Sequence, residues 1–148
     1  MNQALVDNWN KVVTDKDEIW HLGDVSFGNW EKTASILKQL RGRKHLVLGN
    51  HDHQHKNKFS EYFESVQDYK EIKWKGSSII LMHYPILKWN RGHYGTIHAH
   101  GHSHGNLPQE PIRRFDVGVD TEWANYSPIS IDRIIEEAER YPVAEYHH

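Results

Sequence analysis

The chain has 148 residues, of which 37% are hydrophobic, with six Trp and seven Tyr, enough to bury the core of one domain over residues 1–148. Its formal net charge of −2 argues against a protein that binds nucleic acid through bulk electrostatics. It has no Cys, which excludes disulfides, thiolate zinc sites and thiol nucleophiles, and no apolar run long enough for a membrane span. We therefore expect a cytoplasmic protein with no membrane partner. His147 and His148 are either native or the remnant of an expression tag, and we assign them no function.

The first third of the sequence alternates helical and strand patterns. Apolar residues at helical spacing predict a helix over residues 2–13 and another over residues 30–40, the second closed by Gly42. Short apolar runs predict strands at residues 18–22 and 44–48. Helix, strand, helix and strand in this order are typical of a mostly parallel sheet covered by helices.

The rest of the chain predicts a second sheet and a final helix. Residues 53–65 are polar with scattered aromatic side chains, which indicates a loop with irregular helix. The other predicted elements are a hairpin over residues 69–75 and 77–82, short strands at 97–100 and 115–119, and a helix over 131–141. We therefore expect an α/β protein in which two sheets pack face to face with helices outside.

Side chains of the types that can bind metals follow the predicted strands. They are, in chain order, Asp24, Asn50, His51 and His83. Three of them have an ordinary structural explanation: Asp24 could cap the next helix, Asn50 could belong to a Gly-Asn turn, and His83 could be a core histidine bonded to a carbonyl. Because these residues all come at the ends of buried strands, we expect them to lie close together.

Two further histidines strengthen the metal interpretation. His102 and His104 are separated by one residue and flanked by glycines, so in an extended segment both imidazoles project to one face. A surface histidine tract is the alternative explanation. His51 has the side chain best suited to acid–base work near neutral pH. The set favours a hydrolytic metal centre with the candidate ligands Asp24, Asn50, His83, His102 and His104.

Gly-Asp, Gly-Asn-His-Asp, a strand-end His and Gly-His-Ser-His, in this order, resemble the motifs of the calcineurin-like metallophosphoesterases. The resemblance is to the small single-domain phosphoesterases of bacteria and phages, and it covers residues 20–120. It implies a four-layer α/β/β/α sandwich of two mixed sheets flanked by helices. It also implies a dinuclear metal site at the strand ends.

The resemblance assigns roles to the candidate residues. Asp24 would bridge two metals, and His51 would stabilise the phosphoryl oxygens or protonate the leaving group while a metal-bound hydroxide attacks phosphorus. The remaining ligands would be Asn50, His83 and His102 on one metal and His104 on the other. One or two divalent ions are implied, with Mn²⁺ expected first and Fe, Zn, Ni or Mg as alternatives.

One motif of the family is missing from the part of this sequence before Asp24. The family's first strand carries Asp-x-His, which binds the same metal as His104, and no such motif occurs here before Asp24. We therefore expect a fold without its first strand and a weakened or mononuclear centre. The sheet edge left unpaired would allow self-association.

The expected function is that of a metal-dependent phosphoesterase acting on phosphate mono- or diesters. The alternative is a non-catalytic metal-binding or protein-interaction module of the same fold. Arg91 and His93, in the loop before Gly-His-Ser-His, are the candidates for substrate contact. The expected substrate is a small-molecule or nucleotide phosphate ester. Nucleic acid is not favoured, because the Arg and Lys residues are adequately explained as solvated surface charge.

Overall fold

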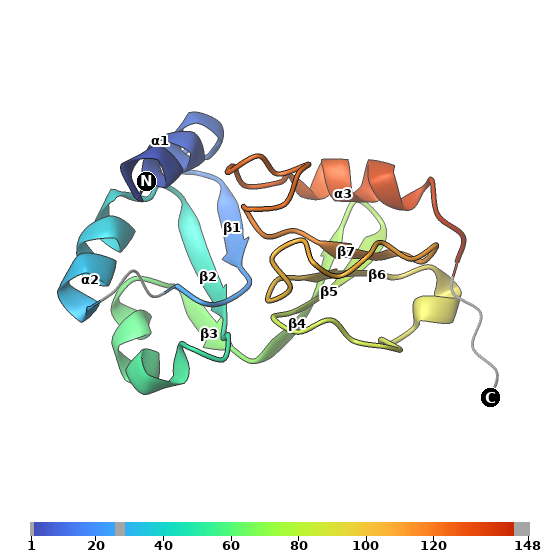
Figure 1. Ribbon diagram of the computed structural model, residues 1–148, viewed down its shortest axis with the longest axis horizontal. Coiled ribbons are helices and arrows are strands. Elements are labelled where there is room, and N and C mark those ends of the chain that lie inside the picture. The colour runs from blue at the N-terminus through green and yellow to red at the C-terminus, as the bar shows by residue number, and fades with distance from the viewer. Residues whose placement is uncertain (1, 26–28, 144–148) are drawn as a thin grey trace.

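The computed structural model describes residues 2–25 and 29–143, which form two β-sheets flanked by helices (Figure 1). The first sheet has the strand order β1-β2-β3, with every pair parallel. The second has the order β4-β5-β6-β7, with β4 antiparallel to β5 and the other pairs parallel. The strands are β1 (Glu18–His21), β2 (Arg43–Val47), β3 (Ser65–Gln67), β4 (Tyr69–Trp74), β5 (Ser77–Met82), β6 (Ile97–His100) and β7 (Arg114–Asp116).

Two of the helices begin after a residue whose side chain accepts a hydrogen bond from a backbone N–H of the first turn. The Asn29 side chain accepts a hydrogen bond from the backbone N–H of Lys32 at 2.8 Å, and Ser130 accepts one from Arg133 at 3.2 Å. The helices are α1 (Asn2–Val12), α2 (Trp30–Gln39), the 3₁₀ helices η1 (His53–Glu61) and η2 (Gly92–Tyr94), and α3 (Ile131–Ala138). In Figure 1, α1 and α2 lie beside the first sheet and α3 packs over the second.

Adjacent residues of β2 enter different cores, because successive side chains of a strand point to opposite faces. Leu46 packs with Leu37 of α2 and Phe59 of η1. Val47 belongs to a second cluster, formed with strands of the second sheet and with Ile134 of α3. The central strand of the first sheet therefore ties both halves of the molecule together and fixes where its carboxyl end lies.

The expected α/β sandwich of two sheets flanked by helices is confirmed. Among the described strands only the second sheet is mixed, which corrects the expectation of two mixed sheets. Strand β3 was not predicted, and β7 ends at Asp116 because the chain turns there, with the Asp116 carboxylate accepting from the N–H of Gly118 at 3.0 Å. His147 and His148 lie outside the described residues. No helix in residues 2–25 and 29–143 is long and apolar enough to cross a membrane.

Candidate metal centre

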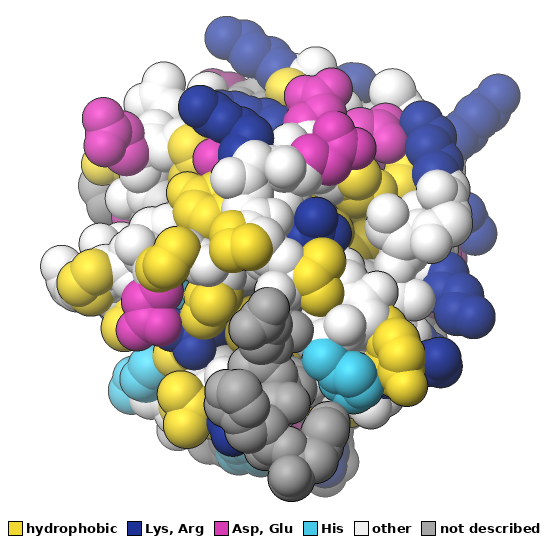
Figure 2. All heavy atoms as spheres, turned by 90° about the vertical axis from the view of Figure 1, so that its right-hand side faces the viewer, with side chains coloured by type: hydrophobic (Ala, Val, Ile, Leu, Met, Phe, Trp, Pro, Cys, Tyr) yellow, Lys and Arg dark blue, Asp and Glu magenta, His cyan; other side chains and the backbone are white. Residues whose placement is uncertain are grey.

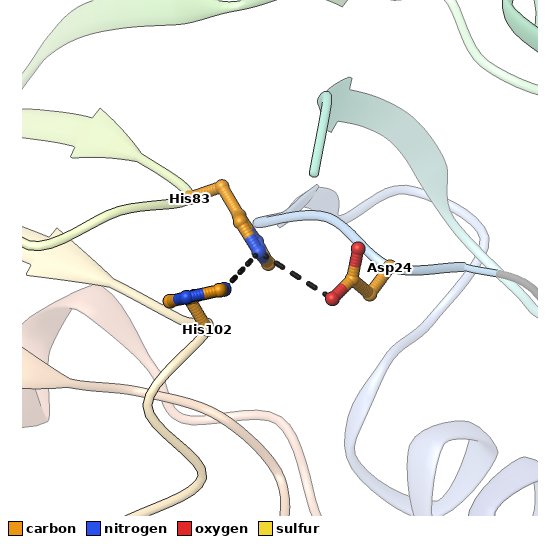
Figure 3. A group of neighbouring side chains, drawn as sticks. All are labelled: Asp24, His83 and His102. Atoms are coloured by element: carbon orange, nitrogen blue, oxygen red, sulfur yellow. Dashed lines mark hydrogen bonds and ion pairs between the residues drawn. The ribbon is translucent and has the colours of Figure 1, made fainter. Parts of the chain in front are cut away.

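Four of the predicted ligands meet where β1, β2, β5 and β6 end, and three of them are drawn in Figure 3. The Nε2 atom of His83 lies 2.9 Å from Asn50 Oδ1, 3.1 Å from His102 Nδ1 and 3.4 Å from Asp24 Oδ2. Asp24 and Asn50 come from the first sheet, and His83 and His102 come from the second. The structure therefore brings Asp24, Asn50, His83 and His102 together around one imidazole nitrogen.

The buried ring of His83 is held in one orientation. Its Nδ1–H donates a hydrogen bond to the carbonyl oxygen of Leu22 at 2.7 Å, and the residue is only 2% exposed. The ring of Tyr84 contacts the rings of both His83 and His102, at centroid distances of 5.0 and 4.8 Å. Because Nδ1 carries a proton in this arrangement, Nε2 is the atom available to bind a metal.

The ligands approach one another because two glycines precede Asp24 and Asn50. A Cβ atom at Gly23 would lie 2.6 Å from the backbone nitrogen of Gly49, and one at Gly49 would lie 2.6 Å from that of Asp24. Asp24 and His102 both have left-handed backbones, with φ of 58° and 63°. The backbone thus departs from strand geometry at both positions, which turns these side chains toward the centre.

Asp52 connects the loops that carry the first-sheet ligands. It is fully buried, and its two carboxylate oxygens accept hydrogen bonds from three backbone N–H groups, those of Asp24 and Gly49 at 2.7 Å and of Val25 at 2.8 Å. The role of Asp52 was not predicted from the sequence. The available indication was its position as the last residue of Gly-Asn-His-Asp.

His51 borders the centre through its backbone. Its backbone N–H donates a hydrogen bond to Asp24 Oδ1 at 3.1 Å, and His51 is an exposed residue. His21, which was not predicted as a site residue, accepts a hydrogen bond at Nδ1 from the N–H of Gly23 at 3.1 Å. Burial lowers the pKa of His21, against the opposing negative charges of Asp52 and Asp24.

His104 is not brought into the group around His83. Its Nδ1 atom lies 2.6 Å from Asp120 Oδ2, and its side chain is 66% exposed. The hydrogen bond to Asp120, followed by that carboxylate's charge, raises the pKa of His104. The loop is also tied down by the N–H of Gly105, which donates to Asp116 at 2.9 Å. A carboxylate on Nδ1 leaves Nε2 as the atom through which His104 could act.

Arg91 and His93 are not brought to the centre either. Strands β5 and β6 are parallel, so the loop between them must return along the sheet, and η2 lies at the end where β6 begins. Arg91 stacks on Tyr94 at 5.4 Å from the ring centroid. Figure 2 looks onto this end of the molecule, where apolar side chains gather, and the loop contributes the exposed Leu87 and Tyr94.

The donor atoms fit a divalent metal ion. Ligand atoms about 2.1 Å from a tetrahedral metal are about 3.4 Å apart, close to the separations found between His83 Nε2 and its three neighbours. Two imidazole nitrogens with a carboxylate and an amide oxygen make a mixed N/O set, which suits Mn, Fe, Zn and Ni. Asp24, His83 and His102 are therefore a candidate ligand group.

Comparison with known proteins identifies the family. The model of the calcineurin-like phosphoesterase superfamily domain matches residues 1–115. The chain belongs to the calcineurin-like phosphoesterase superfamily. Domains of this superfamily typically bind divalent metals and are usually hydrolases, which agrees with the ligand set described above.

The names of three proteins similar to this superfamily member state no activity. The uncharacterized protein MJ1445 of Methanocaldococcus jannaschii is 35% identical over 146 residues, covering 95% of this chain and 76% of its own. The gene 66 protein of Mycobacterium phage D29 is 27% identical over 155 residues, covering 84% of this chain and 77% of its own. The crystal structure of AQ665 from Aquifex aeolicus, a protein of unknown function, matches with a TM-score of 0.71 and 31% identity, covering 92% of this chain and 83% of that one.

Proposed function

We propose that this protein is a metal-dependent phosphoesterase that hydrolyses phosphate mono- or diesters. The observation that carries the proposal is the surroundings of His83 Nε2. Because Nδ1–H already donates to Leu22, Nε2 presents its lone pair to Asn50 Oδ1 and Asp24 Oδ2, which are both acceptors. Either a second proton on the ring or a shared cation relieves this opposition, and a shared cation makes the group a metal site.

The ligand set supports one well-formed metal position, with Asp24, Asn50, His83 and His102 as its ligands. A divalent ion bound there polarises the phosphoryl group and lowers the pKa of a water molecule at the site. We assign Mn²⁺ first, because Asp24 and Asn50 supply the hard oxygen ligands it prefers. His104 remains the proposed ligand of a second ion, to be reached through Nε2.

His51 is the proposed acid. Its backbone N–H donates to Asp24, so the residue lies next to the metal position, and its exposure leaves it accessible to a phosphate ester. From there it would protonate the leaving oxygen or donate a hydrogen bond to the phosphoryl group. The proposed substrate class is a small-molecule or nucleotide phosphate ester in the cytoplasm.

The test uses the purified chain with added Mn²⁺ and generic aryl phosphate mono- and diesters. We expect His51→Ala to lower kcat about 10²–10⁴-fold with unchanged metal content. Asp24→Ala should lower both activity and bound metal. His53→Ala, which changes an exposed histidine of η1, is the matched control and should behave as the parent.

Metal analysis separates this proposal from a non-catalytic module. Turnover that depends on a divalent ion and on His51 supports the phosphoesterase. Bound metal without turnover on any ester, with any divalent ion, refutes it and leaves the metal-binding module. Near-zero bound metal leaves an interaction module, for which concentration-dependent self-association is the measurement.

A further inference from the structure

A second group of metal-type side chains lies away from the phosphoesterase centre. Glu18 is the first residue of β1, His45 lies on β2, and Glu64 directly precedes β3. The side-chain donor atoms of these residues lie within 4.8 Å of one another. The first centre follows the carboxyl ends of β1 and β2, whereas this group lies toward their amino-terminal halves. The two groups share no residue.

The imidazole of His45 is held by two contacts within the protein. It stacks on Trp20 with ring centroids 4.3 Å apart and planes 14° apart, and its side chain is only 11% exposed. Its Nδ1 atom lies 2.6 Å from Ser65 Oγ. A ring fixed by stacking and by a bond at Nδ1 directs Nε2 to one place, as the ring of a metal-ligating histidine must be directed.

Two carboxylates face this directed nitrogen. Nε2 lies 3.1 Å from Glu18 Oε1 and 3.8 Å from Glu64 Oε2. Ligand atoms around a tetrahedral zinc ion are about 3.4 Å apart, midway between these two separations. Both glutamate side chains are 51% exposed, so solvent can supply a further ligand and ions can enter.

We propose that Glu18, His45 and Glu64 form a second divalent-metal site, of the type that takes Zn²⁺, which clips the three strands of the first sheet together. The ion takes the place of a proton on Nε2 beside Glu18, and the neutral ring keeps its one proton on Nδ1, from which it donates to Ser65 Oγ. The site is structural, since each ligand comes from a different strand or its entry. Binding to the folded chain alone stabilises it by mass action. The inference does not depend on the proposed phosphoesterase activity.

Arg43 provides a built-in competitor for the ion. Its Nη2 atom lies 3.8 Å from Glu18 Oε2, with both side chains about half exposed, so the pair is weak. Its positive charge nonetheless opposes a cation bound beside Glu18. Removing that charge with Arg43→Gln should therefore strengthen Zn²⁺ binding, the direction opposite to that of the ligand variants.

The experiment measures Zn²⁺ binding by isothermal titration with the first centre disabled. The background variant is Asp24→Asn with His102→Asn, because asparagine tolerates the left-handed backbone at both positions. We expect it to bind Zn²⁺ at the Glu18–His45–Glu64 group and its melting temperature to rise with Zn²⁺. Adding Glu18→Gln and Glu64→Gln should weaken binding about tenfold or more and abolish that rise.

Control variants test whether the change in Zn²⁺ binding is specific to Glu18, His45 and Glu64. Glu31→Gln with Glu136→Gln, two exposed changes on α2 and α3, should leave Zn²⁺ affinity unchanged in the same background. All variants retain the C-terminal histidines, so differences between them report the cluster alone. NMR of the His45 ring provides a second measurement, in which Zn²⁺ should shift the Nε2 resonance in the background and not in the double-glutamine variant. The proposal is overturned if the double-glutamine variant binds Zn²⁺ with unchanged affinity. It is also overturned if Zn²⁺ does not shift the His45 Nε2 resonance in the background variant.

Discussion

Asp52 is the residue on which the shape of the metal centre depends most directly. One buried carboxylate accepts from three backbone N–H groups, belonging to the two loops that carry Asp24 and Asn50. A hydrogen bond to a charged acceptor is stronger than a neutral one, and a buried donor left unpaired is costly. Asp52 therefore acts on the candidate ligands Asp24 and Asn50 through the backbone that bears them.

Asp52→Asn should destabilise the protein by about 2–4 kcal/mol, because an amide NH₂ then faces backbone N–H donors in a buried position. Urea unfolding measures the change. Asp68→Asn, at an exposed position, is the control and should change the free energy of unfolding by less than about 0.5 kcal/mol. Equal effects of the two substitutions would show that Asp52 is not organising the loops.

The pair formed by His104 and Asp120 makes a separate prediction at the residue scale. Asp120 raises the pKa of His104 through a hydrogen bond and through its charge. Asp120→Asn should therefore lower the pKa of His104, as read from an NMR titration of the imidazole. Glu136→Gln, which changes a residue of α3, should leave the pKa of His104 unchanged. A His104 pKa indifferent to Asp120→Asn would contradict the assignment of Asp120 as its partner.

At the scale of elements, the candidate centre forms because β1 and β2 end side by side and the loops after them pass close to each other. β1 and β2 are parallel and in register over Glu18–His21 and Arg43–Leu46, so the loops after them leave from the same edge. Gly23 and Gly49 then pass each other at a distance that admits no Cβ atom. The same two glycines that look like turn residues in the sequence are contact residues in the structure.

Gly23→Ala and Gly76→Ala compare a crowded glycine with an open one. Both have positive φ, 103° and 83°, but a Cβ at Gly76 would meet nothing within 4 Å. We expect Gly76→Ala to cost about 1–2 kcal/mol from backbone strain alone. Gly23→Ala should cost about 3 kcal/mol or more and weaken metal binding, as measured by denaturation and metal titration. Similar losses in the two variants would remove steric contact as the reason for Gly23.

Much of the fold could be predicted from local patterns, because apolar runs mark the buried strands and capping residues mark the starts of α2 and α3. β3 could not, since Ser65–Gln67 has little apolar character and is a strand through its pairing with β2. The grouping of Asp24, Asn50, His83 and His102 was foreseen because strand ends converge. Arg91 was placed by its nearness in sequence to His102, but a parallel crossover carries it to the other end of the sheet.

Across the whole molecule, buried neutral histidines give the fold a dependence on pH. His98 is fully buried, donates from Nδ1 to the carbonyl of Ile80 at 3.0 Å and accepts at Nε2 from the N–H of Ile86 at 3.0 Å. Burial lowers the pKa of His98 to about 4. Burial also lowers the pKa of His21 and of His100. At His98 the folded protein therefore binds fewer protons than the unfolded chain between about pH 4 and about pH 6.5, and the lowered pKa values of His21 and His100 act in the same direction.

Because the folded protein binds fewer protons than the unfolded chain, its stability falls as the pH is lowered. The contribution of neutral His98 to the free energy of unfolding is fully present above pH 6.5. It is lost progressively as the pH falls toward 4, by up to about 3 kcal/mol. Urea midpoints measured from pH 7 to pH 4 should decline, and His98→Gln should flatten the decline by removing the titrating ring. His53→Gln, exposed on η1, should leave the slope unchanged. A parent protein equally stable at pH 7 and pH 4 would contradict this account.

The two sheets occupy consecutive segments of the chain, with β3 ending at Gln67 and β4 beginning at Tyr69. The ligands divide at the same point, Asp24 and Asn50 before it and His83 and His102 after it. A cut at Asp68 would thus yield two half-sites, neither able to chelate an ion well by itself. Reassembly of the fragments would then be triggered by metal and reversed by a chelator, which makes the fold a natural template for a switchable split protein.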